Sequence, residues 1–163
     1  MSPTASPDPS EPPWLDEDEL AAWMATTALI IRLPGALDAQ LQADQGLTFF
    51  EYLVLAVLSE QPNRTLQMSV VAAETSSSLS RLSHVVKRLE AEGLVTRERV
   101  PGAGRRTNAV LTAAGHAKAV AAAPGHVARV RELVVDAVSA ADLAALRRVS
   151  ETVLARIDPG RSC

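Results

Sequence analysis

Apolar residues in the first third of the chain recur at helical spacing. From Leu15 they fall three or four residues apart through Ile31, which predicts a long helix that continues to Gly46. Pro34 and Gly35 lie inside this pattern. We expect them to kink or interrupt the helix, because proline cannot donate a backbone hydrogen bond.

Helix signals and turn signals then alternate through the middle of the chain. Thr48 and Glu51 have the spacing of a capping box at the start of a helix that ends before Pro62. A small helix over 68–74 and a serine-rich turn lead to a helix over 79–92. This last helix has one apolar stripe, and its other positions are polar and mostly basic. Two helices joined by a short polar turn, the second basic on its outer face, indicate a helix-turn-helix.

A change of period after residue 93 predicts a β-hairpin. Residues 94–100 and 106–111 have the pattern of strands, and Pro101 to Gly104 form a loop between them. The loop is flanked by Arg99, Arg105 and Arg106. A basic hairpin directly after a basic helix predicts a winged helix-turn-helix.

The last third of the chain is again helical. Thr112 caps a helix that we expect Pro124 and Gly125 to interrupt, and Ser139 begins a final helix that ends at Ile157. The apolar stripes of these helices and of the first helix exceed what a small winged helix needs for its own core. Burial in a dimer is the simplest use for them.

Composition is typical of a mainly helical, single-domain protein. Of 163 residues, 47% are apolar but only 3% aromatic, which favours packed helices of Ala, Leu and Val over a β-sandwich. No window approaches 18 consecutive apolar residues, so no membrane span is expected. The first 13 residues hold five prolines and no basic residue, unlike a secretory signal, and we expect a cytoplasmic protein. The lone cysteine, Cys163, can form neither an internal disulfide nor a cysteine zinc site.

The net charge of −3 conceals a basic segment. Residues 76–106 hold seven basic and three acidic side chains, whereas residues 1–20 hold six acids and no base. Local contact with a polyanion is one interpretation, and a solvated charged face is the other. Fourteen arginines against two lysines are typical of a GC-rich bacterial genome.

Two segments carry a resemblance to a known family. The residues from Ser77 to Arg97, SSLSRLSHVVKRLEAEGLVTR, resemble the recognition helix and wing entry of the MarR family of transcriptional regulators. The residues from Arg105 to Gly115, RRTNAVLTAAG, are similar to its wing exit and the start of its next helix. Family wings often carry an aspartate two residues before the tip arginine, whereas this chain has Gly104 there.

The resemblance covers about residues 15–157 and implies a fold. That fold is mainly α with a small β-hairpin wing, a winged helix-turn-helix whose N- and C-terminal helices form an intertwined homodimer. The expected parts are a disordered tail over 1–13, an N-terminal dimerisation helix over 14–45, a DNA-binding region over 46–112, C-terminal dimerisation helices over 113–158 and a tail over 159–163.

The function implied is sequence-specific transcriptional regulation, with repression as the family default. Dimer symmetry predicts an inverted-repeat operator with recognition helices about one helical turn, ~34 Å, apart. In this family, effectors bind between the dimerisation helices and the DNA-binding lobe. Trp23 and Tyr52 could line such a pocket for a small anionic or phenolic ligand, and ordinary core or interface aromatics are the alternative. No cofactor is expected.

Side chains near the start of the recognition helix are the candidates for contact with base edges. Arg81 could hold a guanine through two hydrogen bonds, whereas Lys87 and Arg88 lie further along and suit phosphates. For the serines at 76–78 the alternative is helix capping, and for His84 it is a solvated surface position. The candidate DNA-binding residues are Ser76, Ser77, Ser78, Ser80, Arg81, Ser83, His84, Lys87 and Arg88 in the helix, and Arg97, Arg99, Arg105 and Arg106 in the wing.

Other classes of protein find less support. The sequence contains no H-E-x-x-H, G-x-S-x-G or Walker-type run, so an enzyme is not expected. His84, His116 and His126 lack metal-ligand spacing, and no metal site is expected. The alternative function is a dimeric helical protein-interaction adaptor with weak or no specific DNA binding. The basic segment over 76–106 argues against it.

Overall fold

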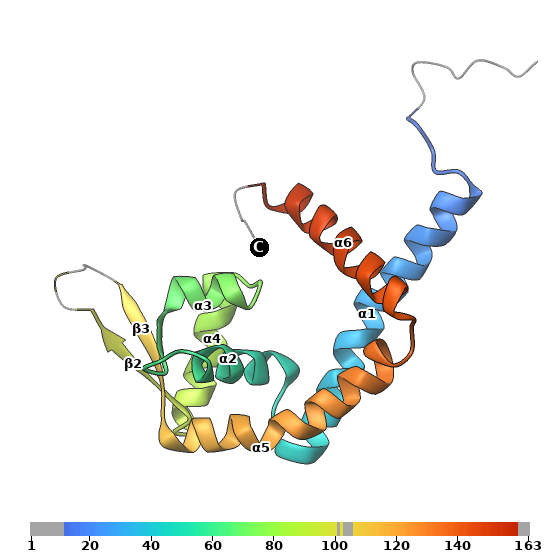
Figure 1. The fold of residues 1–163 in the computed structure, drawn as a ribbon. Helices are drawn as coiled ribbons and strands as arrows, with labels where there is room; N and C mark the ends of the chain where they lie inside the picture. The colour runs from blue at the N-terminus through green and yellow to red at the C-terminus, as the bar shows by residue number, and fades with distance from the viewer. Residues whose placement is uncertain (1–11, 101, 103–105, 160–163) are drawn as a thin grey trace, which may run out of the picture. The chain divides into compact units, whose positions relative to one another are not determined.

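The computed structural model describes residues 12–100, 102 and 106–159 (Figure 1). The chain divides into two compact units, residues 1–35 and 36–163, and each is described here by itself. The tails predicted at the two ends lie mostly outside the described residues, as do Arg105 and Gly104 of the wing loop.

The first helix, α1, spans Glu17–Gln45 and crosses from the first unit into the second. Its start is fixed by a reciprocal pair of hydrogen bonds. The Asp16 N–H donates to Glu19 Oε2 over 3.0 Å, and the Glu19 N–H donates to Asp16 Oδ1 over 2.8 Å. The expected interruption at Pro34 is wrong, because α1 runs through it. Pro34 is exposed, so water can satisfy the one carbonyl that loses its helical partner.

Large apolar side chains of the first unit are exposed. These are Trp14, Leu15, Leu20, Trp23, Met24, Leu29, Ile30 and Ile31. By length and composition alone, α1 is long and apolar enough to cross a membrane, with a mean hydropathy of 1.5 in its most apolar window. The sequence argument against a span counted only unbroken apolar runs, and it missed this helix because scattered polar residues interrupt the run.

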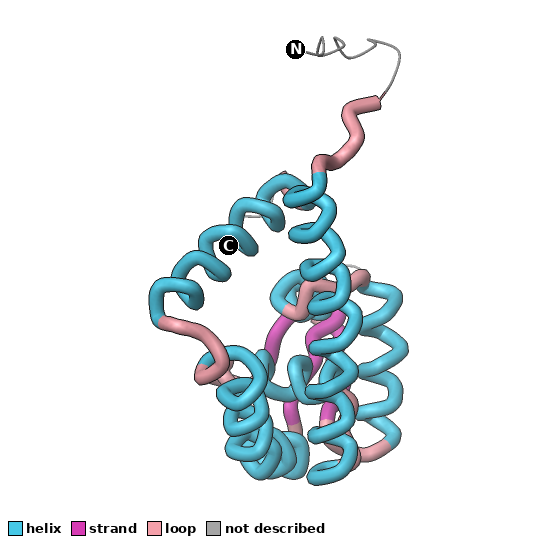
Figure 2. Tube along the Cα trace, turned by 90° about the vertical axis from the view of Figure 1, so that its right-hand side faces the viewer, coloured by secondary structure: helices cyan, strands magenta, loops and turns pink. Residues whose placement is uncertain are grey.

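The second unit contains the predicted winged helix-turn-helix. Its elements are α2 (Phe49–Ser59), β1 (Thr65–Gln67), α3 (Met68–Glu74), α4 (Leu79–Ala91), β2 (Val95–Arg99) and β3 (Thr107–Leu111). The three strands form an antiparallel sheet in the order β1-β3-β2, visible among the helices in Figure 2. Val95 pairs with Leu111 and Arg99 with Thr107, so β2 and β3 make the hairpin that the sequence predicted.

One hydrophobic core holds this unit together. Leucines and valines of α2, α3 and α4 are buried with the apolar face of the sheet, as expected for stripes at helical spacing. The fully buried members are Leu41, Leu47, Val54, Leu55, Leu58, Val71, Leu82, Val86, Leu89, Val95, Ala109 and Ala122. The wing and α4 therefore share a core, and the core sets their relative positions.

A close backbone contact joins the wing to the next helix, α5 (Ala113–Val130). Thr112 caps α5 by accepting the Gly115 N–H over 3.0 Å, and its own hydroxyl donates to Gly93 O over 2.8 Å. A Cβ atom on Gly115 would lie 2.0 Å from Leu94 O, so only glycine fits at this crossing. The close packing of the two segments thus explains why residue 115, which is part of the family resemblance, is a glycine.

The C-terminal helices differ from prediction at one point. The expected interruption at Pro124 is wrong, because α5 runs through this exposed residue. The change comes later, where Arg131–Val135 form a π-helical segment, η1. Ser139 then caps α6 (Ala140–Ile157) as predicted, accepting the Asp142 N–H over 3.1 Å. No described residue of α6 is buried, and its exposed large apolar side chains are Leu146, Val149, Val153, Leu154 and Ile157.

Candidate nucleic-acid interface

The turn before α4 uses its hydroxyl groups to begin the helix. Ser78 is the N-cap, and its Oγ accepts the Arg81 N–H over 3.2 Å. The hydroxyls of Thr75 and Ser77 lie 3.2 Å apart, and Ser76 has a φ of 49°. The capping interpretation therefore holds for Ser78. Its hydroxyl proton remains able to donate to another group.

The two faces of α4 have opposite character. Leu82, Val86 and Leu89 are buried in the core. The candidate contact residues lie on the other side, where Ser80, Arg81, His84, Lys87 and Arg88 are exposed and Ser83 is half-buried. The apolar face of α4 therefore packs on the core, and its polar face is exposed to solvent. An exposed polar helix face is what readout of the major groove needs.

Two of the predicted DNA-contacting arginines are bound within the protein. Arg88 Nη2 lies 2.6 Å from Glu51 Oε1, and the Glu51 side chain is only 2% exposed. Arg97 donates from Nε to Glu90 Oε2 over 2.8 Å, and its Nη2 lies 2.6 Å from the same oxygen. Within the described part of the chain, Glu51 Oε1 accepts no hydrogen bond of good geometry. The ion pair with Arg88 therefore offsets the cost of burying this charge.

These ion pairs tie the recognition helix to its neighbours. The Arg88 pair connects α4 to the capped first turn of α2, where the Thr48 N–H donates to Glu51 Oε2 over 2.8 Å. The Arg97 pair connects α4 to the root of the wing. Sequence reasoning missed both carboxylates as partners. The Glu90–Arg97 pair could have been predicted from the sequence. Gly93 reverses the chain between the two residues, which brings them together although they are seven positions apart.

The remaining cations of the interface form no ion pair within residues 12–100, 102 and 106–159. They are Arg81 and Lys87 on α4, Arg99 on β2 and Arg106 at the start of the second wing strand. All four are exposed. Arg81 is also in contact with an aromatic ring, since its Cζ lies 4.5 Å from the centroid of Phe50. These four cations thus lie on two adjacent parts of the fold, α4 and the hairpin beside it in Figure 1.

An open groove runs between α4 and the wing. Its volume is about 540 Å³. The lining residues are Gln67, Met68, Ser69, Leu79, Ser83, Arg97, Arg106 and Thr107. The groove brings the half-buried Ser83 of the recognition helix to the same surface as Arg97 and Arg106 of the wing.

A separate aromatic cluster joins α2 to α5. The ring of His126 lies 5.6 Å from that of Phe49 and 4.5 Å from that of Tyr52. Desolvation by burial lowers the pKa of His126, and burial, with a smaller contribution from Glu60, raises the pKa of Tyr52. His126 Nδ1 is buried and has no hydrogen-bond partner among the described residues.

The two candidate effector-pocket residues fall in different units. Tyr52 is a buried member of the second unit's core, whereas Trp23 belongs to the first unit and is exposed. The effector pocket therefore stays a prediction. Within the described residues, no group of three or more His, Cys, Asp or Glu side chains is placed to hold a metal ion.

Comparison with known proteins identifies the family. The model of the MarR family matches residues 45–106. The structure is similar to that of Sco3205, a MarR family transcriptional regulator from Streptomyces coelicolor in complex with DNA, with 35% identity, coverage of 93% of this chain and 95% of that one, and a TM-score of 0.88. AbsC, another MarR family transcriptional regulator from Streptomyces coelicolor, matches with 34% identity, coverage of 90% and 98%, and a TM-score of 0.84.

More distant matches share the fold. The structure of NadR in complex with 4-hydroxyphenylacetate has 19% identity, covers 93% of this chain and 97% of that one, and has a TM-score of 0.57. No curated protein matches the chain. The winged helix-turn-helix with a basic recognition helix, together with 35% identity over nearly the whole length of a DNA-bound regulator, shows that this chain belongs to the MarR family of transcriptional regulators.

Proposed function

We propose that this regulator is a homodimeric repressor that binds an inverted-repeat operator and is released by a small-molecule effector. The observation that carries the proposal is the surface formed by α4 and the wing. There Arg81, Lys87, Arg99 and Arg106 are exposed and form no ion pair with described residues. A relative that is 35% identical, Sco3205, has been solved in complex with DNA.

The side chains of this surface have different roles in the proposal. Arg81 reads a base edge, because its planar guanidinium matches the two acceptors of guanine in the major groove. Ser76, Ser77, Ser78, Ser80, Ser83 and His84 contribute hydrogen bonds to bases or phosphates. Lys87 neutralises a phosphate, which sets affinity rather than sequence. Arg99 and Arg106, with Arg105 in the loop between them, contact the adjoining DNA backbone or minor groove.

The two internally paired arginines have a lesser share in the DNA contact. Arg88 and Arg97 are more than one-third exposed at the side chain in each case, so both can still approach a phosphate. Their main role in the proposal is to hold the recognition helix against α2 and the wing. This revises the purely DNA-contacting role that their sequence positions predicted.

Dimerisation accounts for the exposed apolar side chains of α1 and α6. Exposed apolar side chains such as Trp23 and Ile31 in the first unit, and Val149 and Val153 in the second, are unfavourable in water. We infer that a second copy of the chain covers them, giving a cytoplasmic dimer with two recognition helices about one turn of DNA apart. The match to Sco3205, a regulator solved with DNA, covers 93% of this chain and so takes in most of α1, which favours α1 as part of the regulator fold rather than a membrane span.

An effector would act by favouring one of two spacings of the DNA-binding lobes. NadR, which shares the fold, has been solved with the phenolic anion 4-hydroxyphenylacetate. We propose that the effector is a small phenolic or anionic compound, for which Tyr52 of α2 and Trp23 of α1 are the candidate contact residues. Binding of such a compound should release the regulator from its operator.

The test is fluorescence anisotropy of the purified protein on the DNA upstream of its own gene, with a random duplex as control and a series of salt concentrations. Tight binding to one inverted repeat that falls steeply with salt is the expected result. Equal weak binding to both duplexes at every salt concentration would instead favour the adaptor function.

A further inference from the structure

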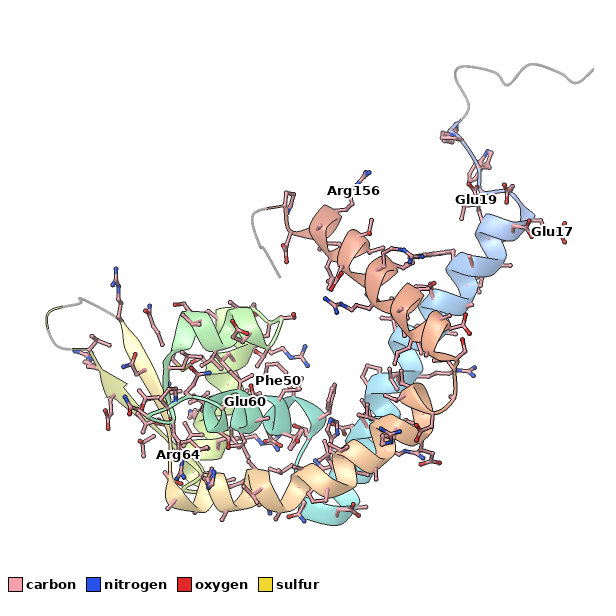
Figure 3. All side chains as sticks on the ribbon, viewed as in Figure 1. Glu17, Glu19, Phe50, Glu60, Arg64 and Arg156 are labelled. Carbon is pink, nitrogen blue, oxygen red and sulfur yellow. The ribbon has the colours of Figure 1, made fainter. Side chains whose placement is uncertain are left out.

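Arg81 is held at two points by the protein itself. Its backbone N–H donates to the Ser78 hydroxyl, and its guanidinium lies on the ring of Phe50, with Cζ 4.5 Å from the ring centroid. A cation at this distance from an aromatic face is attracted by the ring's quadrupole. Phe50, labelled on α2 in Figure 3, is half-buried and packs against the hydrophobic core.

The ring of Phe50 stands on an anchored turn. The residue before it, Phe49, donates its N–H to Asp38 Oδ1 over 2.9 Å. The residue after it, Glu51, completes the capping box with Thr48 and pairs with Arg88 of α4. The first turn of α2 is therefore fixed on both sides of Phe50, and the ring offers Arg81 a rigid surface instead of another flexible side chain.

Contact with the ring and base recognition make different demands on a guanidinium group. The ring attracts the charge of the guanidinium, whereas the N–H groups remain able to donate to a base. A long, flexible arginine can adopt many rotamers, and a ring beneath it reduces the number of orientations that the N–H groups can take. Arg81 forms no ion pair with a described residue, so the contact with Phe50 is what restrains its guanidinium.

We propose that Phe50 is a positioning residue for DNA recognition. Its ring orients the Arg81 guanidinium toward the base edge, and it thereby sets the strength of base discrimination without touching DNA. This inference rests on the proposed function, because it requires that Arg81 reads a base.

The test substitutes Phe50→Leu, which removes the aromatic face and keeps an apolar side chain. The measured quantity is the ratio of Kd values for two operators that differ at one base pair of the half-site. That base pair is the one where Arg81→Ala lowers the ratio most while leaving a measurable remainder. The expected result is a roughly three- to tenfold loss in this ratio. Affinity for random DNA and its salt dependence should not change, because no charge is removed. Phe50→Tyr, which keeps the ring, should retain the wild-type ratio.

A matched control is Phe49→Leu. Phe49 is the adjacent phenylalanine of the same turn and is also half-buried, but its ring stacks on His126 rather than on Arg81. This variant should lose stability in thermal unfolding and keep the wild-type discrimination. If Phe50→Leu unfolds, Phe50→Met tests the same contact with a longer, more adaptable apolar side chain. In an Arg81→Ala background, Phe50→Leu should produce no further loss of discrimination.

Three outcomes would overturn the inference while leaving the proposed function intact. They are a wild-type ratio in folded Phe50→Leu, the same loss in Phe49→Leu, and a further loss in the Arg81→Ala background. A wild-type protein that binds operator and random DNA alike would contradict the proposed function itself, and the inference with it.

Discussion

Arg81 and Lys87 carry the same charge on one helix, yet we expect their removal to affect DNA binding differently. Both are exposed on α4. Arg81→Ala should cost about 1–3 kcal/mol on the operator and little on random DNA, because it removes a base contact. Lys87→Ala should weaken binding to all sequences and lower the salt slope by about one, because it removes a phosphate contact. Anisotropy titrations on both duplexes measure this, and equal losses for Arg81→Ala on the two would rule it out as a base reader.

Also at the scale of one residue, His126 should make stability depend on pH. Burial lowers the pKa of His126 in the folded protein, so the unfolded chain takes up the proton first as the pH falls. The free energy of unfolding should therefore decrease as the pH drops below about 6.5, and level off below the folded-state pKa. Urea unfolding at pH 7.5 and 5.5 measures the difference in the free energy of unfolding between the two pH values. In His126→Phe this difference should be smaller than in the wild type. His84→Gln, at an exposed position, is the control. If His126→Phe keeps the wild-type pH dependence, buried His126 is not its cause.

At the scale of elements, the junction of the wing and α5 depends on one glycine. A Cβ atom on Gly115 would lie 2.0 Å from the Leu94 carbonyl oxygen, so Gly115→Ala must displace the helix from the wing. We expect a loss of about 1–3 kcal/mol, the usual cost of overpacking, in urea unfolding. Gly35→Ala is the control, because that helical position has open space around it and should gain up to about 1 kcal/mol. Equal effects of the two substitutions would refute the packing argument.

The same scale shows which features local sequence can predict. The capping box at Thr48, the N-cap at Ser139 and the turn at Gly93 were predicted correctly, because their signals lie within four residues. The interruptions predicted at Pro34 and Pro124 are wrong, since an exposed proline costs a long helix only one backbone hydrogen bond.

The site was less predictable than the fold. The polar face of α4 followed from its periodicity, and the structure places its residues as expected. The pairing of Arg88 with Glu51 and the contact of the Arg81 guanidinium with the Phe50 ring depend on how α2 packs against α4. These contacts join residues more than 30 positions apart, and no spacing rule in a single sequence reports them. The number of free cations in a basic segment is therefore smaller than its composition indicates.

At the scale of the whole molecule, the proposed regulator needs a second copy of the chain. The exposed apolar residues of α6 should lie in a dimer interface, so Val153→Asp should convert the protein to monomers or unfold it. Light scattering coupled to size-exclusion chromatography measures the mass in solution. Arg148→Gln, an exposed polar position of the same helix, should remain dimeric. A wild-type protein that is monomeric at micromolar concentration would contradict this part of the account.

The central claim is that the whole molecule reads a symmetric DNA sequence through α4 and its wing. The most direct measurement is selection of bound duplexes from a random DNA pool by the purified full-length protein, followed by sequencing. The account predicts enrichment of one inverted repeat whose half-sites are centred about 10 base pairs apart, and loss of preference at one position of each half-site in Arg81→Ala. A pool that shows no enriched sequence, or an enriched sequence that Arg81→Ala leaves unchanged, would contradict it.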